Sequence, residues 1–364
     1  MASSNFLSTL LLLPLSLYTA LSLVPAAEAG PKVPALYVFG DSTADVGNNN
    51  FLPGAQAKAN FPHYGLDFPL SRPTGRFSNG YNGIDFLAMH MGFRRSPPPF
   101  LYVASKISMN RLKGVNFASG GSGILDSTGS TITMTEQIRH FRTIQSNLSM
   151  RMTIDAKNLM LSKSIFLIST GGNDIFGYFS QNKFPNATQK QLFIATLVSA
   201  CQGHLEEMYN LGARKFAIVD VPPIGCCPYP RSLNPTGGCI EALNDLALGF
   251  NKAIKVLLQN LSLNLRGMKY SIGSSYEVVS NIIKKPYALG FKEVKTACCG
   301  SGKFNGEGAC MPNATYCSDR RGYLFWDMLH PTHATSKLAG FAIYHGSLQF
   351  AAPINIRQLV EASN

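Results

Sequence analysis

The 364-residue sequence predicts an α/β fold in which a parallel sheet is covered by helices on both faces. Short, uncharged apolar runs alternate along the chain with longer segments whose apolar residues recur every three or four positions. Such runs are typical of strands buried on both faces, and their alternation with helices indicates βαβ crossovers. Because no fixed-period repeat and no long polar linker divides the chain, we expect a single domain.

Four segments are predicted to be buried strands, and each ends in a polar, glycine-rich or proline turn. They are ALYVF at 35–39, GVNFA at 114–118, SIFLIS at 164–169 and KFAIVDV at 215–221. Helical periodicity predicts helices at 188–212, where Gly212 has the place of a C-cap, and at 240–261. The stretch 53–111, rich in proline and glycine, is predicted to be mostly irregular with one helix near IDFLAMHMG. Long loops of this kind shape binding clefts in α/β enzymes.

The first 29 residues are interpreted as a signal peptide. The apolar run LSTLLLLPLSLYTALSLV is followed by Ala27-Glu28-Ala29, a small-residue cleavage pattern that predicts a cut after Ala29. An uncleaved membrane anchor is the alternative. No later run is long and apolar enough to span a bilayer, so we expect residues 30–364 to be one secreted domain without stable membrane insertion.

The net charge of the chain and the distribution of its basic residues restrict the kinds of partner that it could bind. The formal net charge is +12, and removal of Glu28 with the signal peptide changes it to +13. The basic residues occur as scattered pairs such as Arg94-Arg95, without aromatic residues between them, so a nucleic-acid role is poorly supported. For a secreted protein this charge favours an anionic cell-wall polysaccharide as a partner.

The cysteines all fall at or after position 201. Their even number predicts disulfides in the C-terminal half if the compartment is oxidising, with the pairing left open. A zinc site is the alternative, but the adjacent pairs lack the C-x-x-C spacing of zinc ligands. Four sequons, at Asn147, Asn186, Asn260 and Asn313, predict glycosylated surface positions. The cysteines are Cys201, Cys226, Cys227, Cys239, Cys298, Cys299, Cys310 and Cys317.

Polar residues follow successive predicted strands. Ser42 follows the first strand, 119–123 follows the second, and Asn173 follows the third. In an open parallel sheet, ligands bind at the carboxyl ends of the strands, so we expect these residues to converge. Asp327 and His330 lie three positions apart near the C-terminus. On a helical turn they would be neighbours, with one imidazole nitrogen on the carboxylate and the other facing Ser42.

This set of residues is the one that acyl transfer needs. A serine hydroxyl becomes a nucleophile when a neutral histidine takes its proton, and a carboxylate fixes the tautomer of that histidine. The backbone N–H of Ser42, one in the glycine turn, and the amide of Asn173 could stabilise an oxyanion. Each residue alone also has an ordinary explanation as a turn, loop or surface residue. Their occurrence at the ends of successive strands favours a site.

A metal hydrolase is the alternative interpretation of the C-terminal motif. His333 extends it to D-x-x-H-x-x-H, but no H-E-x-x-H or other third-ligand pattern accompanies it. We therefore expect no metal or cofactor and interpret His333 as a surface residue at a helix start.

Four blocks together resemble those of a known family. FGDSTADVGNNN, GVNFASGGSG, STGGNDIF and FWDMLHPT resemble, in this order, the signature blocks of the GDSL-type esterase/lipases of the SGNH hydrolase superfamily, in its secreted plant branch. The resemblance extends over nearly all of residues 35–350. It implies a three-layer α/β/α, flavodoxin-like fold and the hydrolysis of carboxylic esters by a serine without a cofactor.

The resemblance also implies a role for each site residue. Ser42 would be the nucleophile and one oxyanion donor, His330 the base, Asp327 the residue that orients it, and Asn173 a second oxyanion donor. The third donor would lie in SGG, where counting from Asn116 favours Gly121 over Gly120. Thr43 stands where the family name has leucine, at a position that we expect to matter little.

The leading hypothesis is a secreted carboxylic-ester hydrolase, with an acyl lipid, a cutin-like ester or an acetylated polysaccharide as substrate. An acyltransferase that uses the same acyl-enzyme, and a catalytically idle wall- or glycan-binding protein, are the alternatives. Asp45 and asparagines 48–50 are expected to hold the turn around Ser42 through side-chain to backbone hydrogen bonds.

Overall fold

A computed structural model of the chain describes residues 30–106, 112–182 and 185–363. In this part of the chain a six-stranded sheet has the order β10-β5-β4-β3-β1-β2. Its first five strands in the sequence are parallel, and β10 pairs antiparallel with β5. The order 2-1-3-4-5 is that of flavodoxin-like folds. The strands are β1 (Leu36–Gly40), β2 (Gly114–Asn116), β3 (Ile165–Ser169), β4 (Lys215–Val219), β5 (Lys269–Gly273) and β10 (Ala351–Ala352).

The four predicted strands are confirmed as β1 to β4, although β2 and β4 end earlier than expected. Strands β5 and β10 were not predicted. β5 has the sequence KYSIG, in which Lys269 and Ser271 interrupt the apolar run, and β10 is only two residues long. Such short or mixed segments have no periodic pattern of apolar residues. They form strands because they pair with adjacent strands of the sheet.

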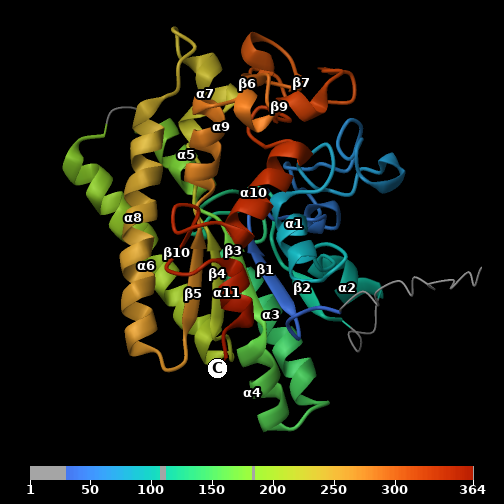
Figure 1. Cartoon of the computed structure of the whole chain (residues 1–364), viewed down its shortest axis with the longest axis vertical. Coiled ribbons are helices and arrows are strands. Elements are labelled where there is room, and N and C mark those ends of the chain that lie inside the picture. The colour runs from blue at the N-terminus through green and yellow to red at the C-terminus, as the bar shows by residue number, and fades with distance from the viewer. Residues whose placement is uncertain (1–29, 107–111, 183–184, 364) are drawn as a thin grey trace, which may run out of the picture. The chain divides into compact units, whose positions relative to one another are not determined.

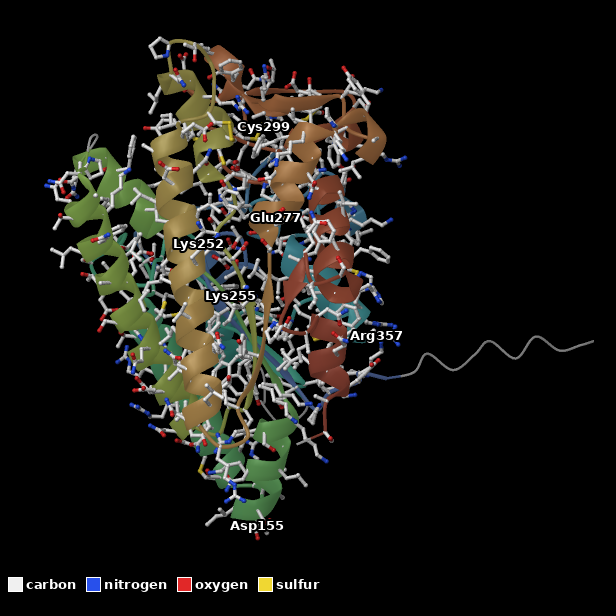
Figure 2. All side chains as sticks on the ribbon, turned by 60° about the vertical axis from the view of Figure 1, so that its left-hand side comes forward. Asp155, Lys252, Lys255, Glu277, Cys299 and Arg357 are labelled. Carbon is white, nitrogen blue, oxygen red and sulfur yellow. A yellow bond between two sulfur atoms is a disulfide. The ribbon has the colours of Figure 1, made fainter. Side chains whose placement is uncertain are left out.

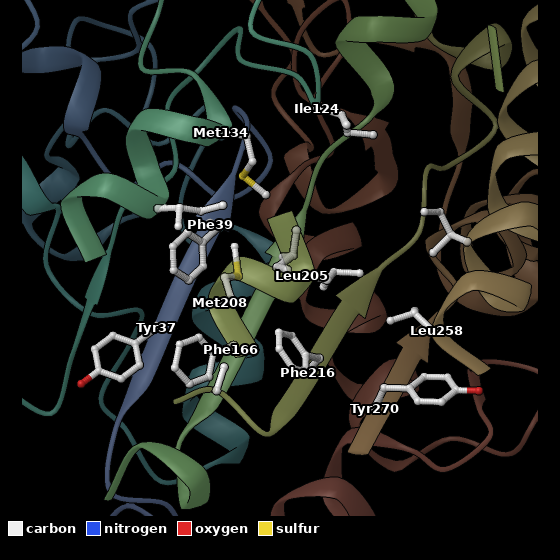
Figure 3. Close-up of a cluster of buried hydrophobic side chains, with 14 of the residues drawn as sticks. Tyr37, Phe39, Ile124, Met134, Phe166, Leu205, Met208, Phe216, Leu258 and Tyr270 are labelled. Carbon is white, nitrogen blue, oxygen red and sulfur yellow. The ribbon is translucent and has the colours of Figure 1, made fainter. Parts of the chain in front are cut away.

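One face of the sheet packs against three long helices. Tyr37, Phe39, Phe166 and Phe216 point toward this face and meet in one buried aromatic cluster (Figure 3). Apolar side chains of the helices cover them, including Ile138, Phe141, Leu205, Met208 and Leu258. The helices are α3 (Met134–Ser149), α6 (Ala187–Asn210) and α8 (Glu241–Asn264).

The intervening strand residues point to the opposite face. Leu36, Val38, Ile165 and Leu167 pack there against a second group of helices. These are α1 (Gly83–His90), α9 (Ser275–Lys284), α10 (His333–His345) and α11 (Ile356–Glu361). Because both faces are covered, the fold has three layers, as the sequence predicts (Figure 1).

The helices predicted at 188–212 and 240–261 are confirmed as α6 and α8, and local signals set the limits of α6. Helix α6 begins with a capping box between Asn186 and Gln189. It ends at Asn210, and after the C-cap Leu211 the chain reaches Gly212, whose φ of +111° is the left-handed conformation that glycine adopts without strain. The N–H of Gly212 bonds to the carbonyl of Tyr209 and that of Ala213 to Met208, which completes a Schellman motif.

The stretch 53–111 has little regular structure where it is described. The predicted helix is confirmed as α1, and α2 (Phe100–Lys106) is a second helix that was not predicted. Helix α1 begins with a capping box of Asn82 and Asp85. The buried ion pair between Asp85 and Arg76, at 2.7 Å, links this helix to the irregular segment before it.

The C-terminal third adds a small region outside the main sheet. Strands β6 (Glu293–Ala297) and β9 (Tyr323–Phe325) pair in parallel, and β7 (Cys299–Gly300) pairs antiparallel with β8 (Thr315–Tyr316). Cys299 lies at the end of the molecule opposite Asp155, which belongs to α4 (Ile154–Lys163) (Figure 2). The remaining helices include α5 (Gly172–Gln181) and α7 (Pro228–Leu233).

Six of the eight cysteines form disulfides, which confirms the expectation of cross-links in the C-terminal half. The pairs are Cys226–Cys239, Cys298–Cys317 and Cys299–Cys310. Cys201 and Cys227 are free. All three disulfides connect residues 11 to 19 positions apart, so each closes a local loop.

The predicted signal peptide, residues 1–29, lies outside the described residues. Pro31–Asn364 forms one compact unit. Within the described ranges, every helix is too short or too polar to cross a membrane. Of the four sequon asparagines, Asn186, Asn260 and Asn313 are exposed, and Asn147 on α3 is half-buried.

Candidate active site

Ser42 stands on a tight turn directly after β1. Gly40 ends the strand with a φ of +136°, and a Cβ there would strike the main chain of Ser169 on the neighbouring β3. The N–H of Asp41 donates to the carbonyl of Ser169, and those of Ala44 and Asp45 donate back to the carbonyl of Asp41. The chain therefore turns sharply and leaves Ser42 partly exposed at the carboxyl edge of the sheet.

The expectation for Asp45 and the asparagines is confirmed. Oδ1 of the buried Asp45 accepts the N–H groups of Gly47 and Asn48, and Oδ2 accepts that of Gly120. Asn48 reaches further, since its amide donates to the carbonyl of Asn116, the last residue of β2, and to that of Ala118 just after it. These side chains fix the serine turn to the end of the next strand.

Thr43 has more contacts than the sequence suggested. Its backbone N–H and its hydroxyl both donate to Oδ1 of Asp41, at 2.9 and 2.7 Å, and its hydroxyl shares a 2.8 Å hydrogen bond with Ser169. Burial raises the pKa of Asp41 to about 6, and the Thr43 bonds lower it only in part. A leucine could not supply the side-chain bonds, so the expectation that this position matters little is not supported by its surroundings.

Asp327, His330 and Ser42 form a continuous chain of hydrogen bonds. The Nδ1 of His330 donates to Asp327, with distances of 2.8 Å to Oδ1 and 2.9 Å to Oδ2. Its Nε2 lies 2.8 Å from the Oγ of Ser42, although the two residues are 288 positions apart. Because the carboxylate can only accept, Nδ1 carries the proton, and Nε2 is free to accept one from the serine.

The expected helical turn at Asp327 and His330 is wrong, and another local structure brings them together. Residues 327–330 form a loop before α10 in which Oδ1 of Asp327 accepts the backbone N–H of Leu329 at 2.9 Å and of His330 at 2.8 Å. The N–H of Trp326 donates to the carbonyl of His330 and closes the loop. Aspartate favours such turns because its short side chain reaches the backbone two residues ahead.

The surroundings of the pair shift both pKa values. Burial by itself raises the pKa of Asp327, but the charge of His330 and the hydrogen bonds from its ring and backbone outweigh it, so the pKa lies below its ordinary value. Burial lowers the pKa of His330, whereas the charge and hydrogen bond of Asp327 and the charge of Asp41 raise it, and the net pKa lies above its ordinary value. An ionised carboxylate beside a more basic imidazole suits a general base.

The glycine turn and Asn173 lie at the same edge of the sheet. Ser119 and Ser122 both donate to the carbonyl of Gly40, so the turn between them is attached to the end of β1. Asn173, in the first turn of α5, donates to the carbonyl of Ser122 at 2.8 Å. Asp174 beside it accepts the N–H groups of Ile124 and Leu125.

The backbone N–H groups at this edge include two, in the serine turn and the glycine turn, that have no protein acceptor in the described part of the chain. Those of Ser42 and Gly121 donate to no protein group in the described part of the chain, whereas that of Gly120 is used by Asp45. Gly121 has a φ of +88°, which favours glycine at this position. This difference supports Gly121 over Gly120 as the donor that the sequence left as a choice.

Two aromatic residues of the stretch 53–111 contact the acid–histidine pair. Tyr64 donates its hydroxyl to Oδ2 of Asp327 at 2.8 Å, and the ring of Phe77 lies 4.9 Å from the imidazole of His330. Sequence reasoning missed both. No local pattern could have revealed them, since Tyr64 and Asp327 are 263 positions apart and their meeting depends on the fold of two separate loops.

His333 belongs to the helix start, as expected, but it is half-buried. It follows Thr332, the N-cap of α10, and its Nδ1 accepts the N–H of Tyr81 at 3.1 Å. In the described ranges no group of three or more histidine, cysteine, aspartate or glutamate side chains is arranged to hold a metal ion.

Ser42, Asn173 and His330 line a cavity of about 160 Å³. Most of its wall is aliphatic and comes from α1, α9, α10 and the ends of β4 and β9. Small residues on α10, Ser336, Ala339 and Gly340, leave this space between the helix and the sheet. The aliphatic lining includes Ile84, Leu87, Val221, Val279, Leu324 and Ile343.

A doubly wound parallel sheet with a serine, a histidine and an aspartate joined at its carboxyl edge defines a class of α/β proteins suited to acyl transfer. Comparison with known proteins narrows the class. The sequence profile of the family described as GDSL-like Lipase/Acylhydrolase matches residues 36–343. The chain belongs to this family, which confirms the resemblance inferred from the four blocks.

Curated relatives match over nearly the whole chain. GDSL esterase/lipase At5g55050 of Arabidopsis thaliana is 38% identical over 341 residues, which cover 90% of each chain. GDSL esterase/lipase At4g16230 of the same plant is 36% identical over 342 residues, or 91% of this chain and 92% of the relative. The family assignment makes the protein a carboxylic ester hydrolase that acts on ester substrates.

Proposed function

We propose that the protein is a secreted serine ester hydrolase in which Ser42 is the nucleophile, His330 the general base and Asp327 the residue that orients His330. The observation that carries this proposal is the hydrogen-bond chain from Ser42 Oγ through both nitrogens of His330 to Asp327, with links of 2.8 Å. Such a chain is the geometry by which a neutral imidazole activates a serine.

Acylation begins when the Oγ of Ser42 attacks the ester carbonyl carbon while its proton passes to Nε2 of His330. The imidazolium that forms is stabilised by Asp327, which stays ionised because its pKa is lowered. The tetrahedral intermediate then breaks its bond to the alcohol oxygen. His330 returns the proton to that oxygen, so the alcohol leaves neutral and the acyl group remains on Ser42.

The carbonyl oxygen gains negative charge in this step and needs donors already in place. The free N–H groups of Ser42 and Gly121 and the second amide hydrogen of Asn173 are the donors that we assign to it. Asn173 uses its first hydrogen on Ser122, which fixes the orientation of the amide before the substrate arrives. Water, activated by His330, would then attack the acyl-enzyme and release the acid.

The cavity beside Ser42 is assigned to the acyl group. Its volume of about 160 Å³ is close to that of an apolar cavity of about 150 Å³ that accepts benzene in another protein. The aliphatic lining, from Ile84 and Leu87 to Ile343, favours a hydrocarbon chain of short to medium length over a sugar ring.

The test is replacement of Ser42 by alanine, assayed on p-nitrophenyl esters from acetate to palmitate. We expect kcat to fall by about four orders of magnitude or more with an unchanged melting temperature. A fluorophosphonate should label the wild type at Ser42 and leave the variant unlabelled. Turnover retained by Ser42→Ala would refute the assignment, and absence of any adduct on the wild type would favour the idle binding protein.

Added alcohols separate hydrolysis from acyl transfer. If the acyl-enzyme is taken by water, the acid should remain the main product when glycerol or another acceptor alcohol is present. A product mixture dominated by the new ester would instead identify the protein as an acyltransferase that uses the same serine.

Secretion and the surface modifications are part of the proposal. N-terminal sequencing of the protein released by plant cells should begin at Gly30, and glycosidase treatment should lower its mass if the sequons are occupied. The net positive charge predicts retention on an anionic wall polysaccharide at low salt, with release as salt increases.

A further inference from the structure

The carboxylate of Asp327 has a hydrogen-bond partner from a distant part of the chain. The hydroxyl of Tyr64 donates to its Oδ2 at 2.8 Å. Tyr64 is 7% exposed and Asp327 is 2% exposed, so the bond is shielded from water. Hydrogen bonds to a charged acceptor in such surroundings are among the stronger ones in proteins.

The two oxygens of Asp327 accept hydrogen bonds from several donors, and of those in the described ranges Tyr64 is the donor that lies farthest away in the sequence. Oδ1 accepts the backbone N–H groups of Leu329 and His330 and faces the Nδ1 of His330. Oδ2 faces the same Nδ1 and accepts Tyr64. Within the described part of the chain, Tyr64 is therefore the one donor to Asp327 that comes from outside the loop 327–330.

The ring of Tyr64 is itself held in place by aromatic contacts. It meets Phe61 and Phe77 edge to face, with centroid distances of 5.3 and 6.1 Å, and Trp326 at 6.5 Å. Its backbone N–H donates to the carbonyl of Phe61. Since Phe77 also packs on the imidazole of His330, one segment of the stretch 53–111 contacts both members of the pair.

Tyr64 remains a donor over the whole range in which a serine hydrolase works. Burial, the charge of Asp327 and the hydrogen bond to it together raise the pKa of Tyr64 well above its ordinary value. A phenol that keeps its proton draws negative charge toward Oδ2 and resists rotation of the carboxylate. Both effects act on His330 through Asp327.

We propose that Tyr64 is a positioning residue for catalysis. It holds the Asp327 carboxylate in hydrogen-bonding position beside His330 and weakens the attraction of that carboxylate for the imidazole proton. This inference rests on the proposed function, because it assigns Tyr64 a role within the same site. A purely structural role, in which Tyr64 only anchors its own loop, makes different predictions for the pH profile.

The principal variant is Tyr64→Phe, which keeps the ring and its aromatic contacts. Loss of the donor leaves more negative charge facing Nδ1, so the pKa of His330 rises and the acidic limb of the kcat/KM profile moves upward by about half a pH unit. Looser orientation should lower kcat about tenfold while KM changes less than about twofold. Tyr323→Phe is the control, because Tyr323 packs beside the same aromatic cluster but does not bond to Asp327.

A second variant tests the sign of the effect without changing the shape of the side chain. Site-specific incorporation of 3-fluorotyrosine at position 64 makes the phenol a stronger donor, so the acidic limb should move downward. Opposite shifts from the two substitutions, with no shift from Tyr323→Phe, support the proposal. A wild-type pH profile in both variants overturns it, even if the melting temperature falls.

A double-mutant cycle shows whether Tyr64 acts through Asp327. In the Asp327→Asn background, Tyr64→Phe should cause little further loss in the rate of fluorophosphonate labelling of Ser42. An equal loss in both backgrounds would overturn the proposal. Ser42→Ala separates this outcome from failure of the proposed function: if that variant is inactive while Tyr64→Phe matches the wild type, only the inference about Tyr64 fails.

Discussion

Ser42 and Asn173 stand at the ends of β1 and β3, on the central sheet, whereas Asp327 and His330 lie on a loop outside it. The strands beneath the first pair contribute to two large apolar clusters that cover both faces of the sheet. The loop of the second pair rests on one of these clusters through Leu329, and also on a smaller cluster that contains Tyr64, Phe77 and Trp326. The acid–histidine side therefore depends in part on a much smaller core, which the nucleophile side does not use.

The smaller cluster is stabilised by disulfides in addition to apolar contacts. Cys298, Cys299 and Cys310 belong to it, and two disulfides pass through it, Cys298–Cys317 and Cys299–Cys310. The backbone N–H groups of Cys298 and Cys299 donate to the carbonyls of Phe325 and Trp326, directly before Asp327. A region that buries too little apolar surface to order itself commonly uses disulfides for this purpose. The acid–histidine side thus depends largely on loops and covalent links, while the nucleophile side depends on the sheet.

Among the variants that separate the two sides, Asp327→Asn should have the largest effect, because it breaks the acid–histidine side and leaves the nucleophile side intact. An amide in this place favours the wrong imidazole tautomer, so we expect kcat to fall by about four orders of magnitude. Circular dichroism and the melting temperature should show a folded protein. A loss smaller than about tenfold would mean that His330 needs no carboxylate, contrary to the hydrogen-bond chain.

Asn173→Ala tests the nucleophile side. Loss of one oxyanion donor should lower kcat by about 10²- to 10³-fold and leave KM nearly unchanged. The matched control is Asn182→Ala at the other end of α5, where, among the described residues, the amide donates only to the carbonyl of Tyr178. If both variants lose the same activity, the effect comes from the helix and not from the oxyanion.

Removal of the Cys299–Cys310 disulfide by serine substitution of both cysteines should destabilise the acid–histidine side by about 2–4 kcal/mol. Activity should then be lost on heating before the sheet unfolds, which assay and circular dichroism can follow in parallel. The Cys226–Cys239 disulfide has a similar separation, 13 positions against 11, and lies outside the small cluster, so its removal is the control. Simultaneous loss of activity and sheet structure in both variants would show that the two sides unfold as one unit.

Of the four predictions, the change of kcat/KM with pH should be the smallest effect. Only neutral His330 can take the serine proton, and its pKa lies above the ordinary value, so kcat/KM should fall as the pH drops, with a midpoint above that of an unperturbed histidine. Asp41 contributes to the raised pKa, so Asp41→Asn should move the midpoint downward. A flat profile between about pH 5 and 8 would be incompatible with His330 as the base.

The sequence was sufficient for the features that local signals encode. Four of the strands, the helices α1, α6 and α8, and the position of Ser42 after β1 follow from apolar runs, periodicity and glycine turns. The closeness of Asp327 and His330 follows from their spacing, although an aspartate turn replaces the expected helical turn. The two-residue β10 and the β5 of mixed polarity could not be predicted. They are strands because they pair with neighbouring strands of the sheet, and not because of their own composition.

Only the tertiary structure decided what surrounds the site. The contact of Tyr64 with Asp327 and that of Phe77 with His330 join segments that no periodic pattern relates. The bonds of Thr43 to Asp41 and Ser169, the three disulfide pairings and the aliphatic cavity under α10 also had no signal in the sequence. The physical reason is range: turns and helices depend on residues a few positions apart, whereas side-chain partners across loops depend on how the whole chain packs.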